Sequence, residues 1–228
     1  MIRQKFGWNY KMLNLVEYAK KYFPNIKIKY KNNSILMKLL SYILFFNKRF
    51  ITKYTTTIGS TIYFPDERYV NSRPRSSIII LLHELVHIYD SKRFNPIVYN
   101  FLYLFPVSLL LVALPLFIFS WKIAIILTIL SLTPLPSYFR MYFERRAYMA
   151  SLYTIQKLSE KMHFNPYLDN AKNSFISEFK SSSYYFMWVF PNINDQFNEA
   201  VKKIQSGHRP YEDPIFDIID DLINSVET

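Results

Sequence analysis

Two histidines and one glutamate form the part of the chain whose spacing is best suited to chemistry. His83, Glu84 and His87 make the pattern H-E-x-x-H within residues 78–89 (IIILLHELVHIY). On a helix, residues four apart share a face with their Cβ atoms about 6 Å apart, so both imidazoles can reach one Zn²⁺. The carboxylate of Glu84 lies one residue further round and can take a proton from an activated water and pass it to a leaving amine. The spacing therefore predicts zinc-dependent hydrolysis with Glu84 as the general base.

The surroundings of this pattern argue against a chance match. The neighbouring residues are uncharged, and the chain contains only four histidines, of which two are these. Burying two imidazoles and a carboxylate in an apolar helix costs free energy unless they share a partner. A bound metal ion would be that partner. The other interpretation is a helix whose His and Glu side chains form hydrogen bonds with their neighbours.

A third metal ligand must come from elsewhere in the chain. A catalytic zinc site has three protein ligands and one open position, and a chain without cysteine must build it from imidazole and carboxylate groups. No histidine follows at the H-x-x-G-x-x-H spacing. Glu144 is the first acidic residue after a long uncharged region and lies in a predicted helix over residues 140–162. We predict Glu144 as the third ligand, and the alternative is an ion pair with a nearby arginine on an exposed face.

The uncharged region between these two segments is long enough to enter a membrane. Residues 94–121 and 123–139 carry no charge, and Lys122 is the only charged residue between Arg93 and Arg140. About 20 apolar residues span a bilayer as a helix, and a core helix usually shows a polar face, which these runs lack. We therefore predict a two-helix transmembrane hairpin over residues 94–139, with a buried helical pair in a soluble core as the alternative.

Flanking charge predicts the orientation of this hairpin. Basic residues precede and follow it, whereas its turn carries only Lys122, so the positive-inside rule keeps both termini and the active site in the cytoplasm. The flanking basic residues are Lys92, Arg93, Arg140, Arg145 and Arg146. The hairpin would return the chain to the same membrane face. Residues 1–93 and 140–228 are then the two halves of one domain.

The net charge of +11 predicts an anionic partner. Residues 18–65 hold nine basic side chains and no acidic one, and they enclose the apolar stretch 34–46 (SILMKLLSYILFF). A basic segment around an apolar one suits the anionic leaflet of a lipid bilayer better than a nucleic-acid groove. No nucleic-acid partner is therefore expected. A buried core helix beside solvated lysines is the other interpretation.

Periodicity elsewhere predicts an α+β fold that is mainly helical with a small β-sheet. Helices are expected over residues 10–23, from a Ser76 or Ser77 cap to Arg93, over 140–162 and over most of 172–205, with a break at Pro191. A strand is expected over 26–31 and a hairpin or bulged strand over 51–64. The acidic tail, 212–228, predicts an amphipathic helix with Phe216, Ile219 and Ile223 on one side. We expect this helix to be solvated, and the alternatives are that it folds over the basic segment or binds a partner.

The H-E-x-x-H helix, the later Glu144 helix and the apolar pair between them resemble gluzincin metallopeptidases. The chain is most similar to the membrane-embedded HtpX and CAAX prenyl protease group, which also places spans between these two elements. The resemblance covers about residues 54–160 and is specific at His83, Glu84, His87 and Glu144. It implies a zincin-like fold and a zinc endopeptidase that cuts polypeptides at the cytoplasmic membrane face.

The sequence also offers candidates for residues that support the metal site, and it allows a second function. Asp90 could accept the free ring N–H of His87 and fix its tautomer, or could be an ordinary carboxylate at a helix end. A donor to the transition-state oxyanion could be His208, Tyr211, Tyr184 or Tyr185. The alternative to a peptidase is a non-catalytic membrane adaptor with a structural metal site. The sequence does not predict an oligomeric state.

Overall fold

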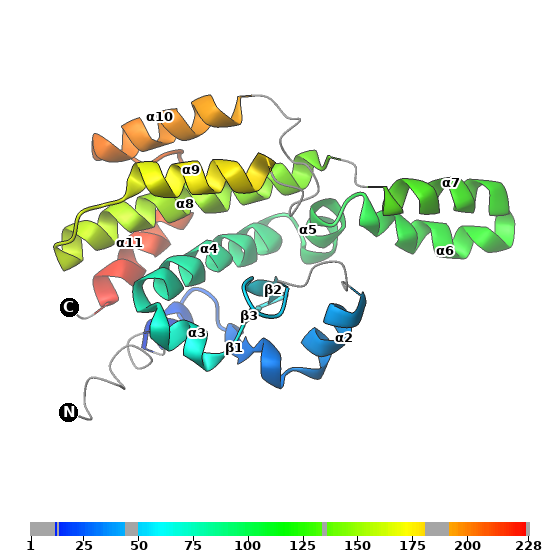
Figure 1. Cartoon of the computed structure of the whole chain (residues 1–228), viewed down its shortest axis with the longest axis horizontal. Helices are drawn as coiled ribbons and strands as arrows, with labels where there is room; N and C mark the ends of the chain where they lie inside the picture. The colour runs from blue at the N-terminus through cyan, green and yellow to red at the C-terminus, as the bar shows by residue number, and fades with distance from the viewer. Residues whose placement is uncertain (1–11, 13, 44–49, 134–135, 181–191, 227–228) are drawn as a thin grey trace. The chain divides into compact units, whose positions relative to one another are not determined.

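The computed structural model describes residue 12 and residues 14–43, 50–133, 136–180 and 192–226 (Figure 1). This part of the chain is mostly helical with one three-stranded sheet, in agreement with the predicted α+β class. The elements in chain order are β1 (Lys27–Tyr30), η1 (Lys31–Asn33), α2 (Ile35–Ile43), β2 (Thr56–Ile58), β3 (Thr61–Phe64), α3 (Glu67–Ser72), α4 (Pro74–Arg93), α5 (Pro96–Tyr103), η2 (Val107–Leu109), α6 (Leu110–Phe119), α7 (Trp121–Leu132), α8 (Tyr138–Met162), α9 (Leu168–Lys180), α10 (Ile193–Gln205) and α11 (Ile215–Ser225).

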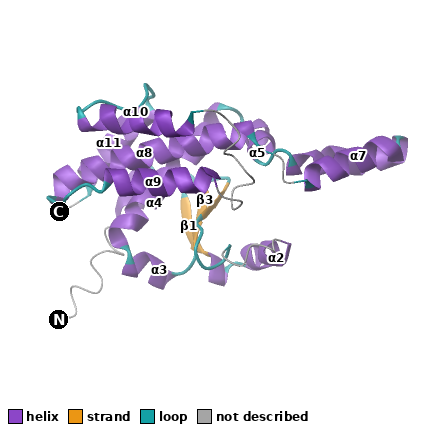
Figure 2. Cartoon of the chain, turned by 45° about the horizontal axis from the view of Figure 1, so that its top comes forward, coloured by secondary structure: helices purple, strands orange, loops and turns teal. Residues whose placement is uncertain are grey.

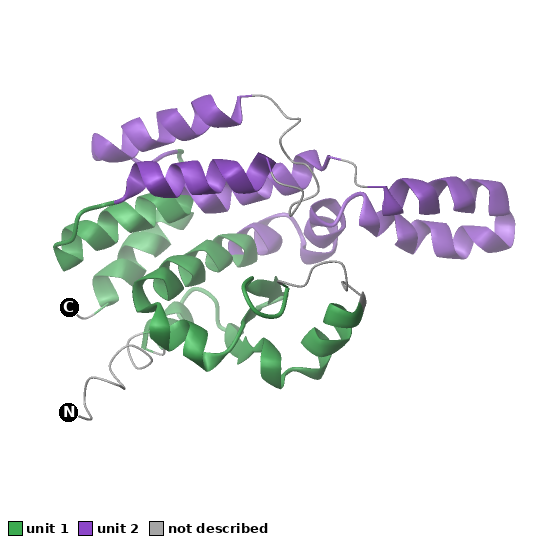
Figure 3. Cartoon of the chain, in the orientation of Figure 1, with its two compact units in different colours: residues 1–88, 150–166, 211–228 green, residues 89–149, 167–210 purple. Residues whose placement is uncertain are grey.

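The chain divides into two compact units, drawn in different colours in Figure 3. Unit 1 holds residues 1–88, 150–166 and 211–228, and unit 2 holds residues 89–149 and 167–210. α4 and α8 are continuous helices. The division between the units falls inside each of them, so both helices contribute residues to both units.

The sheet belongs to unit 1 and has the strand order β1-β3-β2, and Figure 2 shows β1 beside β3. β1 runs parallel to β3, and β2 runs antiparallel to β3 with Thr57 opposite Ile62. Gly59 begins the turn between β2 and β3 with φ of 59°, a left-handed conformation that glycine adopts without steric cost. The predicted strand at 26–31 and the predicted hairpin within 51–64 are therefore both present.

Helix α4, which carries the H-E-x-x-H pattern, begins earlier than expected. Its first residue is Pro74, whose fixed φ and missing N–H suit the first turn of a helix. The prediction that Ser76 or Ser77 caps the helix is therefore wrong. Ser77 is buried inside α4, and its hydroxyl donates to the carbonyl oxygen of Val70 at 3.4 Å. Lys92 and Arg93 end the helix, where positive charge favours the carboxyl end of the helix dipole.

The acidic tail forms α11, which packs into unit 1. Its predicted apolar side is buried, as expected for Phe216, Ile219 and Ile223. The Lys161 ammonium group donates to the carbonyl oxygens of Ile223 and Asn224 at 2.8 and 2.7 Å, which satisfies backbone acceptors in the last turn of the helix. The expectation of a solvated tail helix is therefore wrong, because the apolar side of α11 is buried.

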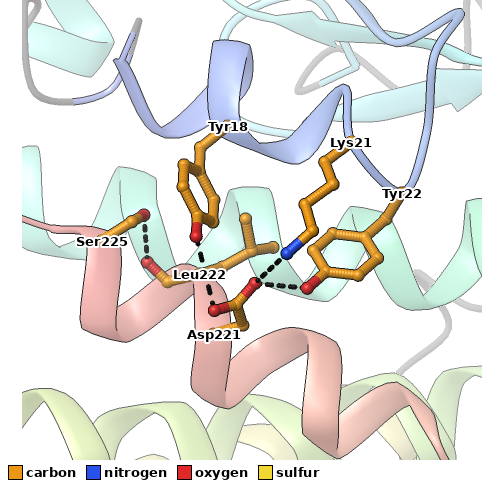
Figure 4. Close-up of polar contacts among 6 residues, drawn as sticks. All are labelled: Tyr18, Lys21, Tyr22, Asp221, Leu222 and Ser225. Carbon is orange, nitrogen blue, oxygen red and sulfur yellow. Dashed lines mark hydrogen bonds and ion pairs between the residues drawn. The ribbon is translucent and has the colours of Figure 1, made fainter.

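Asp221 on α11 joins this helix to the N-terminal segment of unit 1 (Figure 4). Lys21 donates to its carboxylate at 3.2 Å and Tyr18 at 3.5 Å, and Tyr22 also donates to it. The Tyr22 and Lys21 donors hold the pKa of Asp221 below its usual range. The alternative to a solvated tail, folding over the basic segment, therefore occurs at this carboxylate.

In unit 2, the apolar helices α6 and α7 lie side by side as a hairpin (Figure 1). Among the described residues, no single helix is both long and apolar enough to cross a bilayer. α5 and the η2–α6 segment reach that length only together, and they are bent by 114° relative to each other. Pro106 follows α5, and a proline disfavours helix both at its own position and at the residue before it. The two-span hairpin expected from the sequence stays a prediction.

Aromatic contacts connect the remaining helices of unit 2. The ring of Tyr148 on α8 lies 4.5 Å from the ring of Phe175 and 5.6 Å from that of Phe179, both on α9. Phe179 in turn contacts Phe197 on α10 at 5.6 Å. α10 and most of α9 fall in the region 172–205 that was predicted to be mostly helical, and α9 begins earlier, at Leu168. Pro191, where a break was expected, lies outside the described residues.

Candidate metal centre

The two histidines of α4 point toward each other on one face of the helix. The Nε2 atoms of His83 and His87 lie 3.2 Å apart, and the rings meet edge to face with centroids 4.9 Å apart. One carboxylate oxygen of Glu144 on α8 completes the group, since one ligand atom from each of the three residues lies within 4.8 Å of the others. His87 and Glu144 are buried, and His83 is half-buried. The three residues predicted as metal ligands therefore converge.

The distances and donor types fit a tetrahedral metal ion. Two imidazole nitrogens that each lie about 2.0–2.1 Å from a tetrahedral Zn²⁺ are about 3.3 Å from each other. The 3.2 Å separation of the His83 and His87 Nε2 atoms matches this value. Two imidazoles and one carboxylate are also the donor set of hydrolytic zinc sites. The group can therefore hold a divalent metal ion, and the chemistry of its donors favours zinc.

Ser151 on α8 holds the second ring nitrogen of His83. The Ser151 hydroxyl lies 3.1 Å from His83 Nδ1. When Nδ1 donates its proton to this hydroxyl, the Nε2 lone pair is free to bind a metal, which is how neighbours of metal ligands commonly fix the imidazole tautomer. Ser151 is not among the site residues that the sequence predicts. Its spacing of seven residues from Glu144, two helical turns on the same face, could have indicated the role.

Tyr103 at the end of α5 donates a hydrogen bond to Oε1 of Glu144. Both residues belong to unit 2. Because hydrogen bonds restrict the carboxylate, Tyr103 orients the third ligand. The residue falls within the region predicted as a membrane span, and nothing in its sequence context indicates a role at the site.

Asp90 and Arg146 form a buried ion pair between α4 and α8. Arg146 donates from Nε to Oδ2 of Asp90 at 3.0 Å and from a terminal nitrogen to Oδ1 at 2.9 Å. Such a bidentate geometry fixes both side chains. Asp90 thus holds the two ligand-bearing helices together one turn beyond His87, and its predicted hydrogen bond to the His87 ring stays a prediction. The neighbouring Arg145 donates to Gln196.

Glu84, the predicted general base, accepts a hydrogen bond from strand β2. The Thr57 hydroxyl donates to Oε2 of Glu84 at 2.7 Å, and Glu84 is buried. This bond fixes the rotamer of the carboxylate beside His83 and leaves Oε1 as the other proton-accepting atom. Nothing in the local sequence around Thr57 pointed to this contact, because it joins residues 27 positions apart.

A buried lysine supports the strand that carries Thr57. Lys31 is fully buried, and its Nζ donates to the carbonyl oxygen of Phe50 at 2.8 Å and to the Thr56 hydroxyl at 2.7 Å. The same nitrogen lies 3.9 Å from the centre of the Phe50 ring. Burial lowers the pKa of Lys31 to about 7, although the charge of Glu84 acts in the opposite direction. The basic segment of the sequence thus includes one side chain that is buried in the core of unit 1.

Two of the predicted oxyanion donors, His208 and Tyr211, contact residues close to them in the sequence. His208 is exposed and its Nδ1 lies 3.1 Å from the Ser206 hydroxyl. Tyr211 packs edge to face on Phe216 with ring centroids 4.7 Å apart. Tyr184 and Tyr185 lie outside the described residues. A transition-state role for His208 or Tyr211 therefore stays a prediction.

No protein-family model, no curated protein and no solved structure matches the chain.

Proposed function

We propose that the chain is a zinc-dependent peptidase held at a membrane. The observation that supports the catalytic part is the convergence of two imidazoles and one carboxylate, with Nε2 atoms spaced as in a tetrahedral zinc site, next to a fixed glutamate. Such a site in a zincin-like fold is the gluzincin arrangement that the sequence resembles. The substrate class that follows is polypeptide.

The residues of the chain divide the work of hydrolysis. Bound zinc would supply Lewis-acid chemistry, which polarises a carbonyl and makes water nucleophilic near neutral pH. Glu84 accepts the proton of the attacking water and delivers it to the leaving amine, while Thr57 holds its other oxygen. Ser151 and Tyr103 keep His83 and Glu144 in position to bind the metal.

The number of donors separates a catalytic site from a structural one. Structural zinc sites are closed by four protein ligands, whereas catalytic sites keep a position open. Within the described residues, the group contains three donors: His83, His87 and Glu144. This favours the peptidase over the non-catalytic membrane adaptor with a structural metal site.

The membrane part of the proposal is supported by the exposed apolar surface of α6 and α7. A helix that is apolar on all sides is normally buried in protein or lipid. The large residues on both helices are instead mostly exposed, including Ile118 and Phe119 at 83% and 82%. The flanking basic residues favour an anionic cytoplasmic leaflet.

The experiment that tests the catalytic part compares variants purified in mild detergent. Wild-type protein should carry one zinc per chain and cleave an unfolded, fluorescently labelled protein. Glu84→Gln should keep zinc and lose at least about a hundredfold in kcat, because the general base is gone. His83→Ala should lose both zinc and activity. Glu160→Gln, which removes an exposed carboxylate on α8, is the control and should change neither.

Two results would contradict the peptidase. One is wild-type protein that takes up no zinc even when it is refolded or dialysed with excess metal. The other is a Glu84→Gln variant that cleaves as fast as wild type while holding its metal. A fully zinc-loaded wild type with no activity on any unfolded protein would instead support the adaptor.

A further inference from the structure

The apolar hairpin formed by α6 and α7 has a length that does not match a complete bilayer. α7 contains 12 residues, and the η2–α6 segment contains 3 and 10. At a rise of 1.5 Å per residue, α7 is about 18 Å long, and the other arm is about 20 Å. The hydrocarbon core of a bilayer is about 30 Å thick, so one leaflet contributes about 15 Å. Each arm is therefore too short to cross the bilayer and long enough to fill one leaflet.

The two helices pack closely on each other and present their large side chains outward. Ala113 on α6 and Ala124 on α7 are fully buried, as small residues are where two helices approach closely in lipid. Outward-facing apolar side chains continue along both helices. The exposed residues include Leu111, Leu114, Ile118, Phe119, Ile126, Ile129 and Leu132. A continuous apolar surface of this kind marks a binding surface, and here it surrounds the hairpin.

The element before the hairpin lies across it. α5 is bent by 114° from the η2–α6 segment, and it exposes Ile97 and Val98. Its last residue, Tyr103, donates to Glu144, so this end of α5 stays beside the candidate metal centre. An apolar helix in this direction suits the plane of a membrane interface.

Charge and aromatic side chains at the base of the hairpin fit anionic headgroups. Lys92 and Arg93 end α4, and Arg140 lies in the first turn of α8. Tyr138 and Phe139 next to Arg140 are exposed. Basic and aromatic side chains gather at the level of the headgroups, where anionic lipid attracts them.

We propose that the α6–α7 hairpin inserts into a single leaflet of an anionic bilayer, with α5 in the plane of the interface. The proposal rests on the membrane anchorage in the proposed function and is independent of peptidase activity. Ser120 and Lys122 then lie near the middle of the bilayer. The Lys122 ammonium lies 5.8 Å from the centre of the Trp121 ring, a cation–π distance that partly offsets its desolvation.

The absence of cysteine from the chain makes the depth of the hairpin measurable. The Ser120→Cys variant, substituted at the tip, is labelled with an environment-sensitive fluorophore and bound to vesicles that contain phosphatidylglycerol. Lipids brominated near the chain ends should quench the fluorophore more than lipids brominated near the headgroup. Without the fluorophore, the thiol of the Ser120→Cys variant should be protected from membrane-impermeant maleimide both outside and inside the vesicles. Ser72→Cys, on an exposed position of α3, is the control and should react from the outside.

The outcomes distinguish this proposal from the one it rests on. Reaction of the Ser120→Cys thiol with maleimide trapped in the vesicle lumen would overturn the single-leaflet insertion and support two complete spans. Reaction from the outside on vesicle-bound protein would show that the hairpin does not insert. Failure of the whole protein to sediment with vesicles would overturn the membrane anchorage itself, while the zinc and cleavage assays would be unaffected.

Lys122 provides a second, independent test. A charge near the middle of a bilayer is unfavourable, so Lys122→Leu should tighten partition into the same vesicles by about tenfold or more. The matched control Lys202→Leu replaces an exposed lysine on α10 and should not tighten it. In a spanning hairpin, Lys122 would reach the far headgroups and its replacement would bring no gain. Unchanged or weaker partition of Lys122→Leu would therefore overturn the proposal.

Discussion

The buried Lys31 should make the stability of the fold rise with pH above neutrality. Its pKa is about 7 in the folded chain and 10.5 as the reference value for an unfolded one. Below pH 7 both states hold the proton, and the folded state carries the full cost of a buried ammonium group. Between pH 7 and 10.5 the folded state releases this proton while the unfolded state retains it. Because the unfolded state then binds more protons, the free energy of unfolding increases with pH in this range.

The size of the effect follows from the shift. Each pKa unit corresponds to about 1.4 kcal/mol, so the lowering by about 3.5 units is worth about 5 kcal/mol over the whole titration, of which about 4 kcal/mol falls between pH 7 and pH 10.5. Lys31→Met keeps the length of the side chain and removes the titrating group. At pH 7 the variant should be near wild type in stability, since it also removes the cost of the buried charge. At pH 10 it should be several kcal/mol less stable than wild type, because neutral Lys31 keeps its bonds to Phe50 and Thr56.

The assay is urea unfolding followed by far-UV circular dichroism in mild detergent at pH 7, 8, 9 and 10. The measured quantity is the difference in the free energy of unfolding between variant and wild type at each pH. The contributions of other titrating groups cancel in this difference. Lys21 is one such group: contacts with Tyr22 and Asp221 raise its pKa, so it acts in the opposite direction. Lys29→Met, at an exposed position of β1, is the matched control and should give a constant difference. Parallel pH dependences for wild type and Lys31→Met would refute the reasoning.

Three further predictions concern residues that support the metal centre. Thr57→Val should lower kcat about tenfold with KM and zinc content unchanged, because the general base loses its fixed rotamer. Thr57→Ser keeps the hydroxyl and should restore the rate. Equal rates in the two variants would contradict this role of Thr57. Ser151→Ala should weaken zinc affinity about tenfold in a competition assay with a fluorescent chelator, whereas Ser159→Ala, whose hydroxyl bonds to its own helix, should not. Arg146→Met should lower the free energy of unfolding by about 3–5 kcal/mol, because the buried carboxylate of Asp90 loses its partner. Lys157→Met, in an exposed ion pair, should lower it by less than about 1 kcal/mol. Similar losses for both variants would show that the buried pair has no special role.

The sequence predicts those features that depend on neighbours along the chain. The apolar spacing around His83 and His87 places both on one face of a helix, and α4 has that face. The alternation of residues 26–31 predicts a strand with one exposed face, which β1 has. The prediction of Glu144 used only the order of elements and the chemistry of zinc, and the residue lies with the two histidines. In each case the determining interaction is local, or the number of candidate residues is small.

Features that depend on distant residues could not be read in this way. The uncharged run 94–121 looks like one span, but Pro106 interrupts it and α5 turns away. Lys31 looks like a solvated lysine in a basic segment, and only the position of Phe50 and Thr56 shows that it is buried. Composition does not encode which chain segment will cover a residue.

The polar side chains of α4 show why so apolar a helix can carry a reactive site. Its buried polar groups would destabilise the fold if each lacked a partner. Ser151 on α8 contacts His83, Thr57 on β2 donates to Glu84, and Arg146 on α8 pairs with Asp90. These partners leave two imidazole nitrogens of α4 facing each other at a distance that a metal ion would bridge. These buried polar groups of the helix therefore have hydrogen-bond or ion-pair partners. The two imidazole nitrogens that face each other are the place where a cation would add stabilisation.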